Sequence, residues 1–313
     1  MTSRPRWMLA ALAGVAGAAT VRFGRARRAA RIWRPPAGDR RRAGPLAVRT
    51  LGEAGPPVLL LHGLVASGVF WGAAYDGLAD GHRLIVPDLL GFGSSDRPVT
   101  GYGPDDHVRA VLDCLDALGV DEPVTIGAHS LGCLVALRMA ALHPDRVRGI
   151  VGFGPPVYPD GAAARAHIGA AGPMARLFVL PGPVAERACD WLCEHHRIAT
   201  ALAVLTHPRL PTAIAADAVR HSWASYSQTM TRVILEDGAR EWVEAIVVPV
   251  ELVAGDHDPV VDAVFLASLA PTTGIDVRLW PGRHDLPLVD AWRCEAAIAD
   301  FLVIHAPGTP PAS

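Results

Sequence analysis

The chain has 313 residues, half of them hydrophobic, and a formal net charge of −2 at pH 7, which predicts a globular protein with one large core. Residues 1–42 hold eleven arginines and one acidic residue, leaving 18 arginines against 30 acids in the rest. No basic surface with interleaved aromatic residues follows this arm, so a nucleic-acid partner is excluded. The five cysteines have no C-x-x-C spacing, which favours a reducing compartment over redox or zinc chemistry.

The first predicted element is an apolar run of 15 residues, 7–21, with arginines on both sides. As a helix it would extend about 22 Å, short of the roughly 30 Å hydrocarbon core of a bilayer. We expect residues 4–34 to contact the membrane surface, with their arginines against acidic headgroups, in an otherwise cytoplasmic protein. A secretory signal, which the following arginines oppose, and a poorly ordered extension are the alternatives. Residues 34–45, "RPPAGDRRRAGP", indicate a linker.

Short apolar runs then alternate with helical periodicity, as in a mostly parallel, doubly wound sheet covered on both faces. The predicted helix at 105–120 has apolar residues spaced three and four apart, and a second helix at 131–144 ends at a proline. The predicted strands lie within residues 56–63, 82–91, 122–130 and 147–154.

This alternation stops at residue 155, and residues 155–240 are rich in alanine, proline and helical patterns. They predict an inserted helical cap. Strand and helix patterns resume within 247–262, 262–270, 274–282 and 288–305. The sequence thus predicts an α/β fold with an arm at 1–42, a core at 43–154 and 241–305, the cap at 155–240 and a tail at 306–313.

Ser130 stands where the apolar run "VTIGAH" turns into a helical stretch, in the window Ala128-His129-Ser130-Leu131-Gly132. A serine on such a sharp strand-to-helix turn is typical of a nucleophile elbow, G-x-S-x-G, here with alanine at the first small position. A serine that opens a helix is also a common N-cap, so this window alone leaves both roles open.

A nucleophilic serine needs a histidine to take its proton and a carboxylate to orient that histidine. The strand ending in "VAGDHD" supplies Asp256 and Asp258, and the next strand ends before His284 in "PGRHD". The chain order serine, acid, histidine is the one that a strand–turn–helix elbow uses.

Five fragments in this order, "LLLHGLVAS", "VPDLLGFGSSDRP", "AHSLG", "AGDHDPVV" and "GRHDLP", resemble the α/β-hydrolase family, specifically its capped members, from about Pro45 to His305. The resemblance implies that Ser130, Asp258 and His284 are the catalytic residues, with Asp258 preferred over Asp256. It also gives His62 a structural place. The sequence "GRH" departs from the family's usual G-H pair.

An oxyanion hole needs two backbone N–H groups. We expect one from Leu131, at the start of the helix after the nucleophile, and one from Leu64, in the loop after "HG". His129 and Trp223 are weaker candidates for substrate contact, Trp223 through an apolar pocket beneath the cap.

Two further patterns favour structural roles. The loop "PDLLGFGSSDRP" lacks the Walker pattern and is interpreted as a structural loop of the family. Cys189, Cys193 and His196 have helical spacing and are competent zinc ligands, but no fourth ligand is evident, so packed cysteines are preferred and no metal is expected.

The sequence therefore predicts a serine hydrolase that cleaves a carboxylic ester or related acyl bond of a small, apolar substrate, with no cofactor. Serine at the elbow argues against relatives with aspartate there, the epoxide hydrolases and haloalkane dehalogenases. The loop "HGLVAS" differs from the "HGxGPG"-like loop of carbon–carbon bond hydrolases, which remain an alternative together with cofactor-free haloperoxidases and proline-specific peptidases. A receptor-like protein that keeps the triad to hold a ligand, and a membrane-tethered interaction protein, are the rivals outside enzymology.

Overall fold

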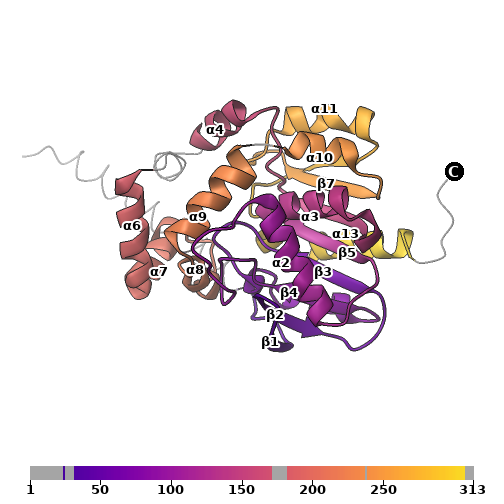
Figure 1. The fold of residues 1–313 in the computed structure, drawn as a ribbon, viewed down its shortest axis with the longest axis horizontal. Coiled ribbons are helices and arrows are strands. Elements are labelled where there is room, and N and C mark those ends of the chain that lie inside the picture. The colour runs from indigo at the N-terminus through magenta and orange to yellow at the C-terminus, as the bar shows by residue number, and fades with distance from the viewer. Residues whose placement is uncertain (1–23, 25–31, 171–181, 237, 307–313) are drawn as a thin grey trace, which may run out of the picture.

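The computed structural model describes residues 24, 32–170, 182–236 and 238–306 and forms an α/β structure around one eight-stranded sheet (Figure 1). The strands lie in the order β1-β2-β4-β3-β5-β6-β7-β8. The β1–β2 and β2–β4 pairs are antiparallel and all others are parallel, which confirms the predicted fold class. The strands are β1 (Asp39–Ala43), β2 (Leu46–Leu51), β3 (Pro57–Leu61), β4 (Arg83–Pro87), β5 (Val124–His129), β6 (Val147–Phe153), β7 (Val250–Gly255) and β8 (Asp276–Trp280).

Helices pack on both faces of this sheet because its central strands are apolar on both sides. In β3, Leu59 and Leu61 belong to one buried cluster, whereas Val58 and Leu60 belong to the other, the alternation expected of successive strand residues. The first cluster includes α2 (Pro104–Ala117), α3 (Leu131–Leu142) and α11 (Ala263–Thr273). The second includes residues of the 3-10 segments η1 (Gly68–Phe70) and η2 (Ala73–Ala79), of α12 (Leu286–Val289) and of α13 (Ala291–Ile304).

Between β6 and β7 the described residues form helices and no strand. Figure 1 shows α6 and α7 on the side of the molecule away from the C-terminus, while α9 lies nearer the sheet. The last helix, α10, packs against α3, where the Arg138 guanidinium lies 5.3 Å from the centre of the Trp242 ring. The segment comprises α4 (Gly161–Ala170), α6 (Pro183–Glu194), α7 (His196–Thr206), α8 (Thr212–Ala218), α9 (Trp223–Thr229), the π-helical segment η4 (Met230–Leu235) and α10 (Ala239–Ala245). The predicted cap boundaries at 155 and 240 remain a prediction.

The linker predicted at 34–45 is in part a strand. Its second half forms β1, at the edge of the sheet, and pairs with β2. Arg40 from this strand binds both carboxylate oxygens of the buried Asp88, and Arg42 binds Asp96. An edge strand can carry charged side chains because part of it faces solvent. The three consecutive arginines of β1 give no apolar pattern, so the sequence did not predict this strand.

The first part of the predicted arm lies outside the described residues, including the apolar run at 7–21 and all but the last residues of 4–34; so does most of the tail at 306–313. Within the part that the structure describes, no helix has both the length and the apolarity needed to span a bilayer.

Candidate active site

Ser130 lies at the end of β5 with its backbone in the left-handed region, at φ 53° and ψ −118°. A residue with a side chain rarely adopts this conformation, which costs on the order of 1–3 kcal/mol and must be held by its surroundings. The Ser130 N–H donates to the Phe153 carbonyl at 3.0 Å and fixes the turn against β6. The side chain makes no capping hydrogen bond to α3, so the geometry is that of a strained elbow rather than an N-cap.

The small residues around Ser130 allow the turn to pack against neighbouring backbone. A Cβ added to Gly132 would lie 2.4 Å from the Leu61 carbonyl oxygen, a contact that excludes any larger residue. Ala128 lies in the strand itself, paired with Leu61 and Gly152 on either side, and is fully buried. Its single methyl group is accommodated there, which explains why alanine can replace glycine at this position.

The structure brings Ser130, His284 and Asp258 together although they follow three different strands. The Ser130 hydroxyl lies 3.0 Å from Nε2 of His284, and Nδ1 of His284 lies 2.8 Å from Oδ2 of Asp258. Because a carboxylate only accepts, Nδ1 carries the proton and Nε2 is free to accept from the hydroxyl. The Asp258 side chain is 1% exposed and that of His284 is 27% exposed, so the acid is shielded while the histidine reaches solvent.

Asp258 remains ionised despite its burial. Burial alone would raise the pKa of Asp258, but the hydrogen bond and charge of His284, together with the Val260 N–H at 2.8 Å, hold that pKa below its usual value. Each carboxylate oxygen therefore has a fixed partner, Oδ1 on the backbone and Oδ2 on the imidazole.

Asp256, the other candidate acid, faces a different partner. Its Oδ1 accepts from the Gly282 N–H at 2.9 Å and from His257 Nδ1 at 2.6 Å. These bonds, the first of them the largest effect, lower the pKa of Asp256. Asp256 thus holds the loop that carries His284 and does not touch the imidazole itself.

The two predicted oxyanion donors belong to the start of α3 and to the loop after β3. Leu131 is the first residue of α3, so its N–H has no carbonyl partner within the helix. The other loop approaches from β3: a Cβ on Gly63 would lie 3.1 Å from the Ser130 Cβ. This loop carries Leu64 and then Val65, which has a φ of 50°. An oxyanion-hole role for both N–H groups remains a prediction.

Two buried histidines flank this loop. Nδ1 of His62 donates to the Gly63 carbonyl at 2.7 Å, and its Nε2 accepts from the Leu89 N–H at 2.8 Å, a structural arrangement. His129 donates from Nε2 to the His284 carbonyl at 2.9 Å and stacks on Phe70.

Burial, followed by the charge of His284, lowers the pKa of His129 to about 3, so the ring is neutral. The Nε2–H of His129 donates to the backbone carbonyl of His284. These contacts hold the backbone of His284 in place, and substrate contact by His129 remains a prediction.

Three tryptophans of the described residues differ in exposure and in neighbours. Trp71 is fully buried in the core, and Trp191 is 46% exposed and stacks on His195. Trp223 begins α9, is partly buried against the larger core cluster and stacks with Tyr226 at 5.9 Å between ring centres. Trp223 therefore remains the aromatic candidate for an apolar contact under the cap.

Gly154 is a part of the site that the sequence did not single out. It follows β6 with φ 62°, and a Cβ there would lie 3.0 Å from His284 Nδ1 and 3.3 Å from Asp258 Oδ2. The absence of a side chain at Gly154 leaves room for the hydrogen bond between acid and histidine. The glycine that ends "VGFG" was the available signal.

The glycine-rich loop after β4 is organised by the buried Asp88. Its carboxylate accepts from the N–H groups of Gly68 and Ser94, both at 2.8 Å. Asp88 thus ties the loop to η1 and to itself, in keeping with the structural role predicted for it.

Comparisons with known proteins find similarity over part of the sequence and over most of the fold. Residues 56–168 match the family model described as alpha/beta hydrolase fold. Haloalkane dehalogenase 2 of Mycobacterium tuberculosis is 38% identical over 98 residues, 31% of this chain and 34% of that protein. The match thus spans about a third of the curated relative's length.

Two solved structures show the same fold over most of the chain. A bromoperoxidase from Bacillus anthracis aligns with a TM-score of 0.67 at 22% identity, covering 85% of this chain and 100% of the other. An esterase from Rhodococcus sp. aligns with a TM-score of 0.66 at 23% identity, covering 84% and 98%. With its sheet order, its elbow after β5 and these matches, the chain has the α/β-hydrolase fold.

Proposed function

We propose that this protein is a serine hydrolase that cleaves a carboxylic ester or a closely related acyl bond. The observation that carries the proposal is the hydrogen-bonded chain from the Ser130 hydroxyl through His284 to Asp258, at 3.0 and 2.8 Å. A strained serine whose hydroxyl is directed at a neutral imidazole nitrogen, with a buried carboxylate behind the ring, is the arrangement needed for nucleophilic attack on a carbonyl.

In the proposed first half-reaction, His284 Nε2 takes the proton of Ser130 as its Oγ attacks the carbonyl carbon. The negative oxygen of the tetrahedral intermediate accepts from the N–H groups of Leu131 and Leu64. When the intermediate collapses, the bond to the alcohol breaks, and His284 returns its proton to the leaving oxygen. Asp258 stabilises the imidazolium that forms between these two transfers.

In the second half-reaction, water attacks the acyl-enzyme. His284 takes a proton from the water, the second tetrahedral intermediate uses the same two N–H groups, and its collapse returns the proton to Ser130 and releases the acid. Each step uses groups of this chain and water.

The chemistry of serine favours acyl transfer over dehalogenation, the activity in the name of the curated relative. Attack of a serine alkoxide on a carbon–halogen bond would form an ether, which lacks a carbonyl and gives the oxyanion donors nothing to stabilise. Attack on an ester carbonyl forms an ester that the same groups hydrolyse. Because residue 130 is serine, we assign the chain to acyl chemistry.

We propose a small substrate with an apolar part. Trp223, Leu64 and Val65 are partly buried, pack against the larger core cluster and are suited to an alkyl or aryl group rather than to a charged one.

The test combines active-site labelling with a substrate screen. A fluorophosphonate probe is expected to label the wild-type chain once, at Ser130, and not the Ser130→Ala variant. Over p-nitrophenyl esters of graded acyl length, hydrolysis should depend on Ser130 and prefer one range of lengths. Labelling that persists in Ser130→Ala would overturn the nucleophile, and stoichiometric labelling without turnover on any ester would favour a ligand-holding protein over an enzyme.

A further inference from the structure

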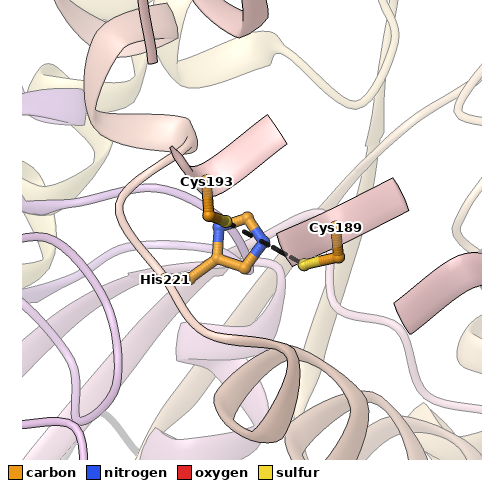
Figure 2. A group of neighbouring side chains, drawn as sticks. All are labelled: Cys189, Cys193 and His221. Carbon is orange, nitrogen blue, oxygen red and sulfur yellow. Dashed lines mark hydrogen bonds between the residues drawn. The ribbon is translucent and has the colours of Figure 1, made fainter. Parts of the chain in front are cut away.

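A second group of reactive side chains lies in the helical segment between β6 and β7, outside the Ser130 site. Cys189 and Cys193 stand four residues apart on α6, so both side chains leave the same face of that helix. His221 comes from the turn between α8 and α9 and meets them (Figure 2). The two sulfur atoms are 4.0 Å apart, and Nε2 of His221 is 3.4 Å from the Cys189 sulfur.

His221 is oriented as a ligand by its own backbone. Its Nδ1 lies 2.9 Å from the Ala218 carbonyl oxygen, which can only accept, so Nδ1 carries the proton. In the neutral ring Nε2 then presents a lone pair toward the two sulfurs. A histidine that binds a metal nearly always donates its other ring N–H to such a carbonyl or carboxylate, which fixes the tautomer and the ring plane.

The separations fit one tetrahedral ion. With a metal–sulfur bond of about 2.3 Å and a metal–nitrogen bond of about 2.0 Å, tetrahedral angles place two sulfurs about 3.8 Å apart and a sulfur and a nitrogen about 3.5 Å apart. The observed 4.0 and 3.4 Å lie close to both values, and the ligand atoms of all three residues fall within 4.8 Å of one another. The chain has therefore brought the donors to coordination distance.

The donor set also selects the metal. Two thiolates and an imidazole are the ligands of borderline-soft zinc, whereas magnesium and calcium prefer oxygen. Cys189 is buried and Cys193 is partly exposed, so the group is shielded on one side and open on the other. Among the described residues, no fourth histidine, cysteine or acid joins this group.

We propose that Cys189, Cys193 and His221 form a Zn²⁺ site in which water completes the tetrahedron. On binding, the two thiols lose their protons to solvent and the neutral imidazole coordinates through Nε2. The ion would join α6 to the turn before α9, whose Ser225 and Tyr226 are buried in the fold. The site is independent of the hydrolysis proposed for Ser130.

The structure changes the ligand set that sequence spacing suggested. His196 continues the i, i+4, i+7 pattern after Cys189 and Cys193, but α6 ends at Glu194 and α7 starts at His196. This break changes the helical phase, and His196 is exposed. The third ligand is instead His221, 28 residues after Cys193. His196 lies outside the group and therefore serves as the matched control.

The test is zinc content and cobalt spectroscopy on the full chain, purified under reducing conditions. We expect one zinc per chain by mass spectrometry of the metal. After removal of zinc, added Co²⁺ should give the visible bands of a tetrahedral ion and the near-ultraviolet charge-transfer band of bound thiolate. Cys193→Ser and His221→Ala should each weaken zinc binding by on the order of 100-fold or more, while His196→Ala should bind as the wild type does.

Fluorophosphonate labelling and circular dichroism serve as fold checks on each variant. A wild-type chain that retains no zinc and shows no tetrahedral cobalt spectrum would overturn the site. So would equal zinc affinity in Cys193→Ser, or loss of zinc in His196→Ala with retention in His221→Ala. If a variant fails to fold, chelator titration of the wild type decides: a zinc site predicts a lower Tm on chelation, because the ion binds only the folded chain.

Discussion

Replacing Asp258 by asparagine tests the arrangement of the proposed triad. The Val260 N–H donates to Oδ1 of Asp258 at 2.8 Å, and an asparagine carbonyl oxygen would keep this bond. The amide NH₂ must then face His284 Nδ1, which in the wild type donates a hydrogen bond to Oδ2 at 2.8 Å. Nδ1 would become an acceptor, the ring proton would move to Nε2, and Ser130 would lose the base that faces it.

The size of the effect follows from this tautomer reversal. Serine hydrolases in which the histidine is held in the wrong tautomer lose on the order of 10⁴ in kcat, which corresponds to about 5.5 kcal/mol of transition-state stabilisation. We expect that loss for Asp258→Asn, because its side chain is 1% exposed and water cannot readily replace the carboxylate.

Asp256→Asn is the matched control. Its amide oxygen can still accept from the Gly282 N–H, so we expect kcat to stay within about tenfold of wild type. The assay is the initial rate on the best p-nitrophenyl ester, normalised to folded protein by circular dichroism. If Asp258→Asn retains more than about a tenth of the activity while Asp256→Asn loses it, the acid has been misassigned.

Three further predictions concern the rest of the chain. Gly154→Ala and Gly119→Ala each add a Cβ at positive φ, but only the Cβ at residue 154 meets His284, at 3.0 Å from Nδ1. Both variants should lower the free energy of unfolding by about 1–2 kcal/mol. Only Gly154→Ala should also lower kcat, on the order of 100-fold. Burial lowers the pKa of His107 to about 4, so below about pH 6.5 the unfolded chain binds more protons than the folded chain and the free energy of unfolding decreases as the pH falls. His107→Gln should remove about 2 kcal/mol of this decrease between pH 7.5 and 5.0, measured by urea unfolding. An unchanged decrease in the variant would refute the prediction. Deleting residues 1–31, which keeps β1, should abolish sedimentation with acidic lipid vesicles; equal sedimentation of both chains would refute membrane contact.

Much of the fold could be predicted because its signals are local. The strand "PVLLL" is buried on both faces and therefore appears as a continuous apolar run. The amphipathic helix α2 shows its period directly in the sequence. The meeting of Ser130, Asp258 and His284 after β5, β7 and β8 could also be predicted, because parallel strands end at one edge of the sheet.

The remaining features depend on contacts between distant residues. Strand β1 has the sequence "DRRRA", which contains no apolar pattern typical of a strand. It is held by pairing with β2 and by the ion pair between Arg40 and Asp88. The meeting of His221 with Cys193 depends on the path of the chain through α7 and α8. The role of Gly154 depends on side chains that follow two other strands.

In the proposed mechanism, the spacing of Ser130, Asp258 and His284 along the chain sets when activity can first exist. Ser130 and His284 are 154 residues apart, and β7 and β8 follow the helical segment that separates them. A ribosome-bound chain can complete the elbow and the helices above it while the imidazole is still unsynthesised. In the proposed mechanism Ser130 therefore lacks its base until β8 and the loop that carries His284 have been synthesised and have docked.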